Sequence, residues 1–177
     1  MAEVFVNSQT RAAGIVTTST GATIGANATT ITGVSTAGVA VGHMVDNQHF
    51  RGGAKVSALG SGQVTVDKTS TNSASAASQT VRFMGPTTCY TSPSATKSIL
   101  IGGTYANLTN NNVNIFVELK SGSTHTGIAN DIPVPSGSSF VISDAGKTVM
   151  TADDEIRIYC DTSDAADVTM GILQGVN

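Results

Sequence analysis

Strict alternation of apolar and polar residues in short runs is the dominant pattern of this sequence. In the run 155–160, Ile156, Ile158 and Cys160 fall on one face of an extended chain, and the residues between them fall on the other. The same period of two recurs at 55–59, 63–67, 113–119 and 168–173. No stretch shows the 3.6-residue period of a helix, so the sequence predicts an all-β protein.

The composition supports the same fold class. Serine and threonine make up about a quarter of the 177 residues, and glycine adds 19 more. Charged residues account for 12% and aromatic residues for 5%, and there is no tryptophan. Small and β-branched residues favour short strands joined by tight turns. A coiled coil, which needs many Glu, Lys and Leu residues, is excluded.

The charge distribution argues against binding to nucleic acid or membrane. The formal net charge is −3, and the nine basic residues are spread along the chain without a cluster. Nucleic-acid binding requires a positive stripe that releases counterions from phosphates. The longest strongly apolar stretch, 99–103, is far too short to span a bilayer. The first residues show no basic segment followed by an apolar one, so we expect no signal peptide.

Two regions of different texture divide the chain. The first, residues 20–85, predicts five short strands, at 29–33, 39–45, 54–59, 64–67 and 80–84. The sequence GSG at 60–62 has the length and composition of a hairpin loop. The stretch 69–79 has little apolar content and is predicted to be a surface loop. This region is expected to form a small barrel or a compact sandwich.

The second region, residues 86–177, carries stronger strand patterns. The predicted strands lie at 98–101, 113–119, 139–142, 147–150, 155–160 and 168–173. Turn-forming residues separate them, including Asn, Gly, Pro and Asp clusters such as the one at 144–146. Strands at this spacing indicate an antiparallel β-sandwich of jelly-roll type.

The cysteines and histidines suggest no catalytic or redox site. Cys89 and Cys160 are far apart in sequence, and buried free thiols are favoured over a disulfide because nothing places the chain in an oxidising compartment. His43 and His49 are six residues apart, which leaves a metal pair conceivable. A surface or half-buried role is the favoured interpretation, because no carboxylate lies at ligand spacing.

Two acidic groups are the other candidates for a metal site. Three acids stand side by side at 153–155, and Asp161, Asp164 and Asp167 recur every three residues. Clustered oxygens of this kind can hold Ca²⁺, but turn-forming acids at the rim of a sheet are the favoured interpretation. We therefore predict no metal, no cofactor and no catalytic set, and we expect a non-enzymatic protein.

Several segments resemble a family of small virion structural proteins of tailed bacteriophages. They lie at 2–20, 87–109, 113–120, 131–142, 146–160 and 167–176, and the resemblance covers about 110 residues, from 2–20 and from 87–176. Within them, six residues occupy the positions expected for the family: Pro93, Pro133, Pro135, Gly146, Lys147 and Asp154. The resemblance implies a β-sandwich on the outside of a virion, with no active site to carry over.

The chain departs from this family by an insertion of about 65 residues after the Thr-rich segment near residue 20. The inserted piece is similar to small β-modules of phage fibre and surface proteins. We therefore expect a nested architecture: 1–19 as an N-terminal arm or first strand of the sandwich, 20–85 as an inserted β-module, and 86–177 as the sandwich. Insertion at a surface loop costs little free energy. The alternative is a tandem arrangement, with residues 2–18 extended across a neighbouring subunit.

Three functions follow as expectations. The first is a capsid decoration (cement) protein on the outer surface of the head. The second is a neck, collar or tail-fibre accessory protein, and the third is a carbohydrate-binding module. Aromatic faces usually bind sugars in such modules, and only Tyr90, Tyr105 and Tyr159 offer tyrosine rings.

The expected partners are other virion proteins, either the major capsid protein or proteins of the neck and tail. Val4, Phe5 and Val6 form the candidate anchor to a partner, although the same residues suit the first strand of the sandwich. A homo-oligomer, trimer or dimer, would match capsid symmetry. We expect synthesis in the host cytoplasm and location in the virion.

Overall fold

The computed structural model describes residues 3–142 and 147–176, and within them the chain is all-β, with 15 strands and no helix. The predicted fold class is confirmed. The chain divides into two compact units. The first contains Met1–Ala13, Pro86–Cys160 and Asp164–Asn177, and the second contains Gly14–Gly85 with Asp161–Ser163. The predicted turn at 144–146 lies outside the described residues.

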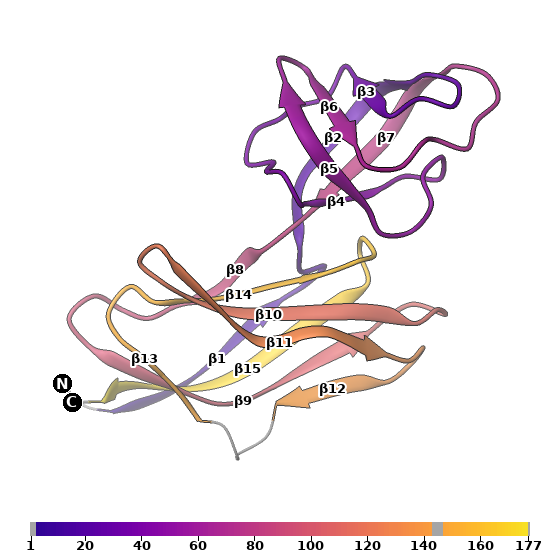
Figure 1. Ribbon diagram of the computed structural model, residues 1–177. Helices are drawn as coiled ribbons and strands as arrows, with labels where there is room; N and C mark the ends of the chain where they lie inside the picture. The colour runs from indigo at the N-terminus through magenta and orange to yellow at the C-terminus, as the bar shows by residue number, and fades with distance from the viewer. Residues whose placement is uncertain (1–2, 143–146, 177) are drawn as a thin grey trace. The chain divides into compact units, whose positions relative to one another are not determined.

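The first unit is a β-sandwich of two antiparallel sheets, drawn as two layers in Figure 1. One sheet has the order β1(Val4–Thr10), β15(Ala166–Val176), β9(Lys97–Asn107) and β12(Ser139–Ile142), and β13(Thr148–Met150) also pairs with β9. The other has the order β11(Thr124–Val134), β10(Val113–Ser121), β14(Glu155–Cys160) and β8(Thr87–Thr91).

Alternation along the strands builds the core of the sandwich. Ile156, Ile158 and Cys160 are fully buried, as the sequence predicted. Between the two sheets, the other buried side chains include Leu100, Tyr105, Val113, Ile115, Val117, Met150, Val168, Met170 and Ile172. Removing this apolar surface from water is the main stabilising contribution.

The second unit is a closed six-stranded barrel. Its order is β2(Ile15–Ile24), β3(Thr30–Thr32), β6(Gln63–Val66), β5(Ala54–Gly60), β4(Met44–Asp46) and β7(Ala76–Met84), with β7 closing on β2. Its core consists of small and β-branched residues with two phenylalanines: Ala22, Ile24, Ile31, Val34, Val39, Val45, Phe50, Ala54, Val56, Val64, Val66, Val81 and Phe83. The predicted hairpin loop is confirmed, because Gly60 pairs with Gln63 across it.

The structure divides the N-terminal segment differently from the expected boundary at residue 19. The barrel unit begins at Gly14, so β2 belongs to the barrel and only β1 joins the sandwich. In this chain β1 pairs with β15 along its whole length, rather than extending away as an arm. The two ends of the insertion meet, since the Gly85 amide donates to the Gly14 carbonyl at 2.9 Å.

Two details of the barrel prediction are wrong. Of the run 39–45, only Met44 and Val45 are in a strand, because the Gly-rich stretch before them forms turns. The expected surface loop 69–79 ends early, because Ala76–Gln79 already belong to β7. These residues are mostly exposed or half-buried. Backbone pairing with β2 holds them in the barrel where the apolar pattern gives no signal.

Candidate binding surface

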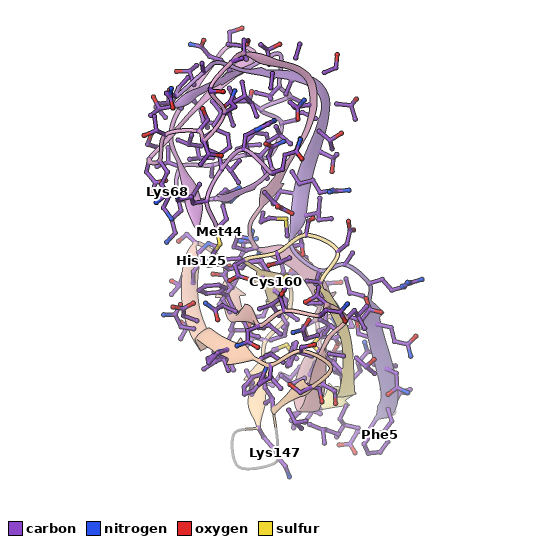
Figure 2. All side chains as sticks on the ribbon, turned by 90° about the vertical axis from the view of Figure 1, so that its right-hand side faces the viewer. Phe5, Met44, Lys68, His125, Lys147 and Cys160 are labelled. Atoms are coloured by element: carbon purple, nitrogen blue, oxygen red, sulfur yellow. The ribbon has the colours of Figure 1, made fainter. Side chains whose placement is uncertain are left out.

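The edge strand β1 positions the predicted anchor residues. The structure separates Val4, Phe5 and Val6, because successive residues of a strand point to opposite faces. Val4, at the start of the strand, is 51% exposed. The Ser8 hydroxyl donates to the Cys89 carbonyl of the other sheet at 2.6 Å, and Val6, Ser8 and Thr10 are half-buried on this inward side. Phe5 therefore faces outward, with 76% of its surface exposed. Figure 2 shows its ring at the margin of the sandwich.

Phe5 belongs to a row of apolar side chains that crosses the whole sheet. The strand register pairs Phe5 with Leu173, Leu173 with Ile99, and Ile99 with Val149. Directly paired residues on one face have Cβ atoms about 5 Å apart. We call these four residues the apolar row.

All four residues of the apolar row point to solvent. Their neighbours along the strands, Leu100, Met150 and Ile172, are at most 1% exposed and face the core. Val149 is 56% exposed, and Leu173 and Ile99 are half-buried. A contiguous apolar surface rimmed by polar residues is typical of an interaction site.

Next to the apolar row, two glycines face each other across β15 and β9. Gly171 pairs directly with Gly102. A Cβ atom at Gly102 would lie 3.0 Å from the Ile142 carbonyl oxygen, which is closer than such contacts normally come. This glycine pair adds no side chain of its own to the surface, and Asn7 of β1 pairs with Gly171 on the other side.

The outer face of the other sheet is polar and aromatic. Phe116 and Tyr159 stack across β10 and β14 with ring centroids 4.5 Å apart and planes 7° from parallel. Burial raises the pKa of Tyr159, and the negative charges of Glu118 and Asp131 raise it further. The stacking covers one face of the Tyr159 ring, which a sugar would otherwise use.

The carbohydrate hypothesis loses its other two tyrosines. Tyr105 is 0% exposed and packs against Phe140 in the core, with centroids 5.8 Å apart. Tyr90 is 9% exposed, and its hydroxyl binds Ser98 at 2.9 Å and Gln174 at 2.8 Å. Neither ring is exposed enough to stack on a ligand, so these three tyrosines form no aromatic platform.

Charged side chains form cross-strand pairs next to the aromatic pair. Glu118 Oε1 lies 3.3 Å from Arg157 Nη1 and 3.0 Å from His125 Nδ1. Two residue pairs further along the strands, on the same face, the Lys120 ammonium donates to Glu155 at 2.5 Å. Each acid thus lies opposite a base on the neighbouring strand, and such cross-strand pairs stabilise a sheet.

Neutralising Glu155 is expected to flatten the acid limb of the stability profile. The hydrogen bond from Lys120, then that from the Thr88 hydroxyl at 2.6 Å, hold the pKa of Glu155 below its ordinary value of 4.5. A group whose pKa is lowered on folding adds stability above its unfolded pKa, and this stability is lost as pH falls through the folded pKa. Glu155→Gln should therefore be less stable at neutral pH and lose less below about pH 4.5.

Urea unfolding from neutral to strongly acidic pH measures this effect. Asp153→Asn is the control, because Asp153 is an exposed acid whose removal changes the net charge equally, and asparagine tolerates its φ of 65°. A profile for Glu155→Gln parallel to that of the wild type would contradict the assigned role of the Lys120 pair.

The acidic groups predicted as possible calcium ligands bind protein atoms. Burial opposes the charge on Asp154, but bonds from the Ser121 hydroxyl and from the Thr151 amide and hydroxyl outweigh it and lower its pKa. Asp167 accepts from the Ala12 amide at 3.1 Å and lies 3.6 Å from Arg11 Nε. Among the described residues, no three His, Cys, Asp or Glu side chains gather as a metal site.

The cysteines and histidines contact protein atoms rather than forming a site. Cys89 and Cys160 are buried free thiols, as predicted, and burial raises the pKa of Cys89. His43 Nδ1 accepts a hydrogen bond from the backbone amide of Ala40 at 3.2 Å, and His49 Nε2 lies 3.5 Å from the side-chain nitrogen of Gln48.

Sequence reasoning found Phe5 but missed the other three residues of the apolar row. The runs that contain Ile99, Val149 and Leu173 were identified as strands, but these three positions were not singled out. In these runs both faces are apolar, so the pattern marks a buried strand equally well.

The described residues include no helix of sufficient length and hydropathy to cross a membrane. No protein-family model, no curated protein and no solved structure matches this chain.

Proposed function

We propose that this chain is a non-enzymatic structural protein of a tailed-phage virion that attaches to the outer surface of the head as a decoration protein. The observation that carries the proposal is the apolar row, which places Phe5, Leu173, Ile99 and Val149 in register on the solvent side of one sheet. The resemblance of the sandwich segments to small phage virion proteins supports the same function.

The physical chemistry of the row suits attachment to a repeating lattice. Burying one exposed apolar side chain contributes roughly 1.5–3 kcal/mol, so a few such residues give modest affinity for a single site. Linking several copies on one lattice raises the overall avidity without new contacts. The row lies on strands, which hold the side chains more rigidly than loops would.

Truncating the Phe5 ring is expected to weaken attachment about tenfold to a hundredfold, because each 1.4 kcal/mol changes affinity tenfold. The measurement is co-sedimentation of Phe5→Ala protein with heads that lack the native protein. Gln9→Ala is the matched control, since Gln9 is exposed on the same face of β1 but lies outside the row. Equal binding by Phe5→Ala and wild type would contradict this contact.

A point substitution tests the contact better than deletion of the N-terminal segment. Because β1 pairs with β15 from Val4 to Thr10, deletion removes a strand of the sandwich and exposes a new edge. Phe5, at 76% exposure, contributes little to folding, so its truncation reports on binding.

Quantitative mass spectrometry of purified particles, calibrated on the major capsid protein, tests the location. A copy number that scales with the capsid lattice supports a decoration protein. A copy number that matches the symmetry of the neck or tail supports the accessory function instead. Absence from the particle contradicts both.

A further inference from the structure

The outer edge of β1 is open for backbone pairing. β1 is the end strand of its sheet, and its one strand partner among the described residues is β15. Its register with β15 runs from Val4 to Thr10 without a bulge. The segment VFVNSQT contains no charged residue and no proline. Natural proteins normally protect a sheet edge with charged residues or prolines, because the unpaired amide and carbonyl groups of the edge attract another strand.

The other edges of the sandwich carry this protection. β11 contains Pro133 and has register shifts against β10. β8 has five residues and a register shift against β14, and β12 and β13 have four and three residues. Among the described edge strands of the sandwich, β1 alone is seven residues long, free of register shifts and without a charged residue or proline.

The residues that flank β1 make it complementary to itself. Glu3 precedes the strand and is exposed. Arg11 follows it in a bend; its Nε lies 3.6 Å from Asp167 of its own chain, but its side chain is 89% exposed, so the guanidinium stays accessible to a second copy. If two copies of β1 lie antiparallel about a twofold axis at Asn7, all seven strand residues find a partner on the same face. This register places Glu3 of each copy opposite Arg11 of the other, so two ion pairs of opposite charge close the ends of the ladder.

We propose that two copies of this chain associate through their β1 edges in this register, which joins their two sheets into one continuous antiparallel sheet. The twofold axis is perpendicular to the sheet, so the apolar rows of both copies face the same side. The proposal goes beyond the virion function and does not depend on it, because the pairing uses backbone groups at the edge whereas attachment uses the face.

A single cysteine introduced in place of Asn7 tests both the dimer and its register. Directly paired residues have Cα atoms about 4.5–5.5 Å apart, which is within disulfide reach. Asn7→Cys should therefore cross-link rapidly under mild oxidation. Gln9→Cys is the matched control, since both positions are exposed on the same face. In the proposed register the two Gln9 residues lie about 14 Å apart, beyond disulfide reach.

The native cysteines do not interfere, because Cys89 and Cys160 are only 8% and 0% exposed. Light scattering of the full chain gives the mass independently, with twice 17.9 kDa expected at high micromolar concentration. A monomer mass at every concentration overturns the proposal. A dimer in which the Asn7→Cys and Gln9→Cys variants cross-link equally, or in which neither cross-links, overturns the β1 interface.

Charge reversal supplies a second test that spares the strand itself. Glu3→Arg places like charges opposite each other at both ends of the ladder, and we expect the dimer dissociation constant to rise about tenfold. Glu3→Arg combined with Arg11→Glu restores opposite charges between the copies and should restore association; all these variants are made in an Asp167→Asn background, so that the new acid does not face Asp167 of its own chain. Failure of the double variant to recover, with an unchanged melting temperature, contradicts the Glu3–Arg11 contact.

Discussion

Replacing Asn107 by aspartate is expected to destabilise the sandwich by about 3–5 kcal/mol at neutral pH. Asn107 is 3% exposed. Its side-chain nitrogen donates to the carbonyls of Asn111 at 2.7 Å and Val134 at 3.0 Å, and its oxygen accepts from the Thr109 amide at 2.8 Å. The amide thus joins the end of β9 to the loop before β10 and to the end of β11.

The substitution keeps the shape of the side chain but reverses half of its chemistry. An aspartate oxygen in place of the nitrogen has no proton to donate, so it would face the carbonyl oxygens of Asn111, Val134 and Pro135 and carry a buried charge. Leaving buried polar groups unpaired costs more than the net contribution of a hydrogen bond.

Urea unfolding of three variants separates these effects. Asn107→Ala loses the hydrogen bonds without adding a charge and should cost about 2–3 kcal/mol. Asn112→Ala, in an exposed position of the same loop, should lie close to the wild type. If Asn107→Asp stays within about 1 kcal/mol of the wild type, the buried amide does not hold these segments together.

The elements best predicted from the sequence are those with one apolar and one polar face. The run 155–160 alternates without exception, and its predicted bounds and buried residues agree with β14. Strands of this kind carry their burial pattern in the period of two, because one face meets the core and the other meets water. Four residues of β12 at 139–142 were also placed correctly.

The elements that were missed depend on long-range pairing. β11 contains a left-handed residue, Asp131 with φ of 56°, and register shifts that break its alternation. β8 is short, and its burial is determined by the strands on either side. The hydrophobic pattern within a strand does not show which other strands it pairs with, so β8 and β11 could not be predicted from the sequence.

The candidate binding surface could be predicted only in part for the same reason, that it depends on strand pairing. Phe5 was identified because it stands in an apolar group at the start of the chain, but the apolar row exists only through the register of β1 with β15 and of β15 with β9. Tyr105 illustrates the reverse error. It was considered as one ring of a sugar-binding surface, yet alternation in β9 turns it into the core.

Removing the ring of Phe83 is expected to destabilise the barrel by about 3–5 kcal/mol, because the cavity left in a closed core adds to the lost burial. Phe83 is 0% exposed and lies on β7, paired with Thr17 of β2 on one side and Val45 of β4 on the other. It is one of two phenylalanines in a core of otherwise small and β-branched residues, so few neighbours can move to fill the space.

Hydrogen exchange of Phe83→Ala, together with urea unfolding, measures the cost and its location. Because Phe83 belongs to the barrel unit, protection should be lost from amides of the barrel strands before those of the sandwich. Leu59→Ala is the control, since Leu59 is 43% exposed on β5 and should cost less than about 1 kcal/mol. A loss of protection spread equally over both units would show that barrel and sandwich unfold as one cooperative body. A loss confined to the barrel means that the sandwich, with its β1 edge and apolar row, keeps its structure when the inserted unit opens.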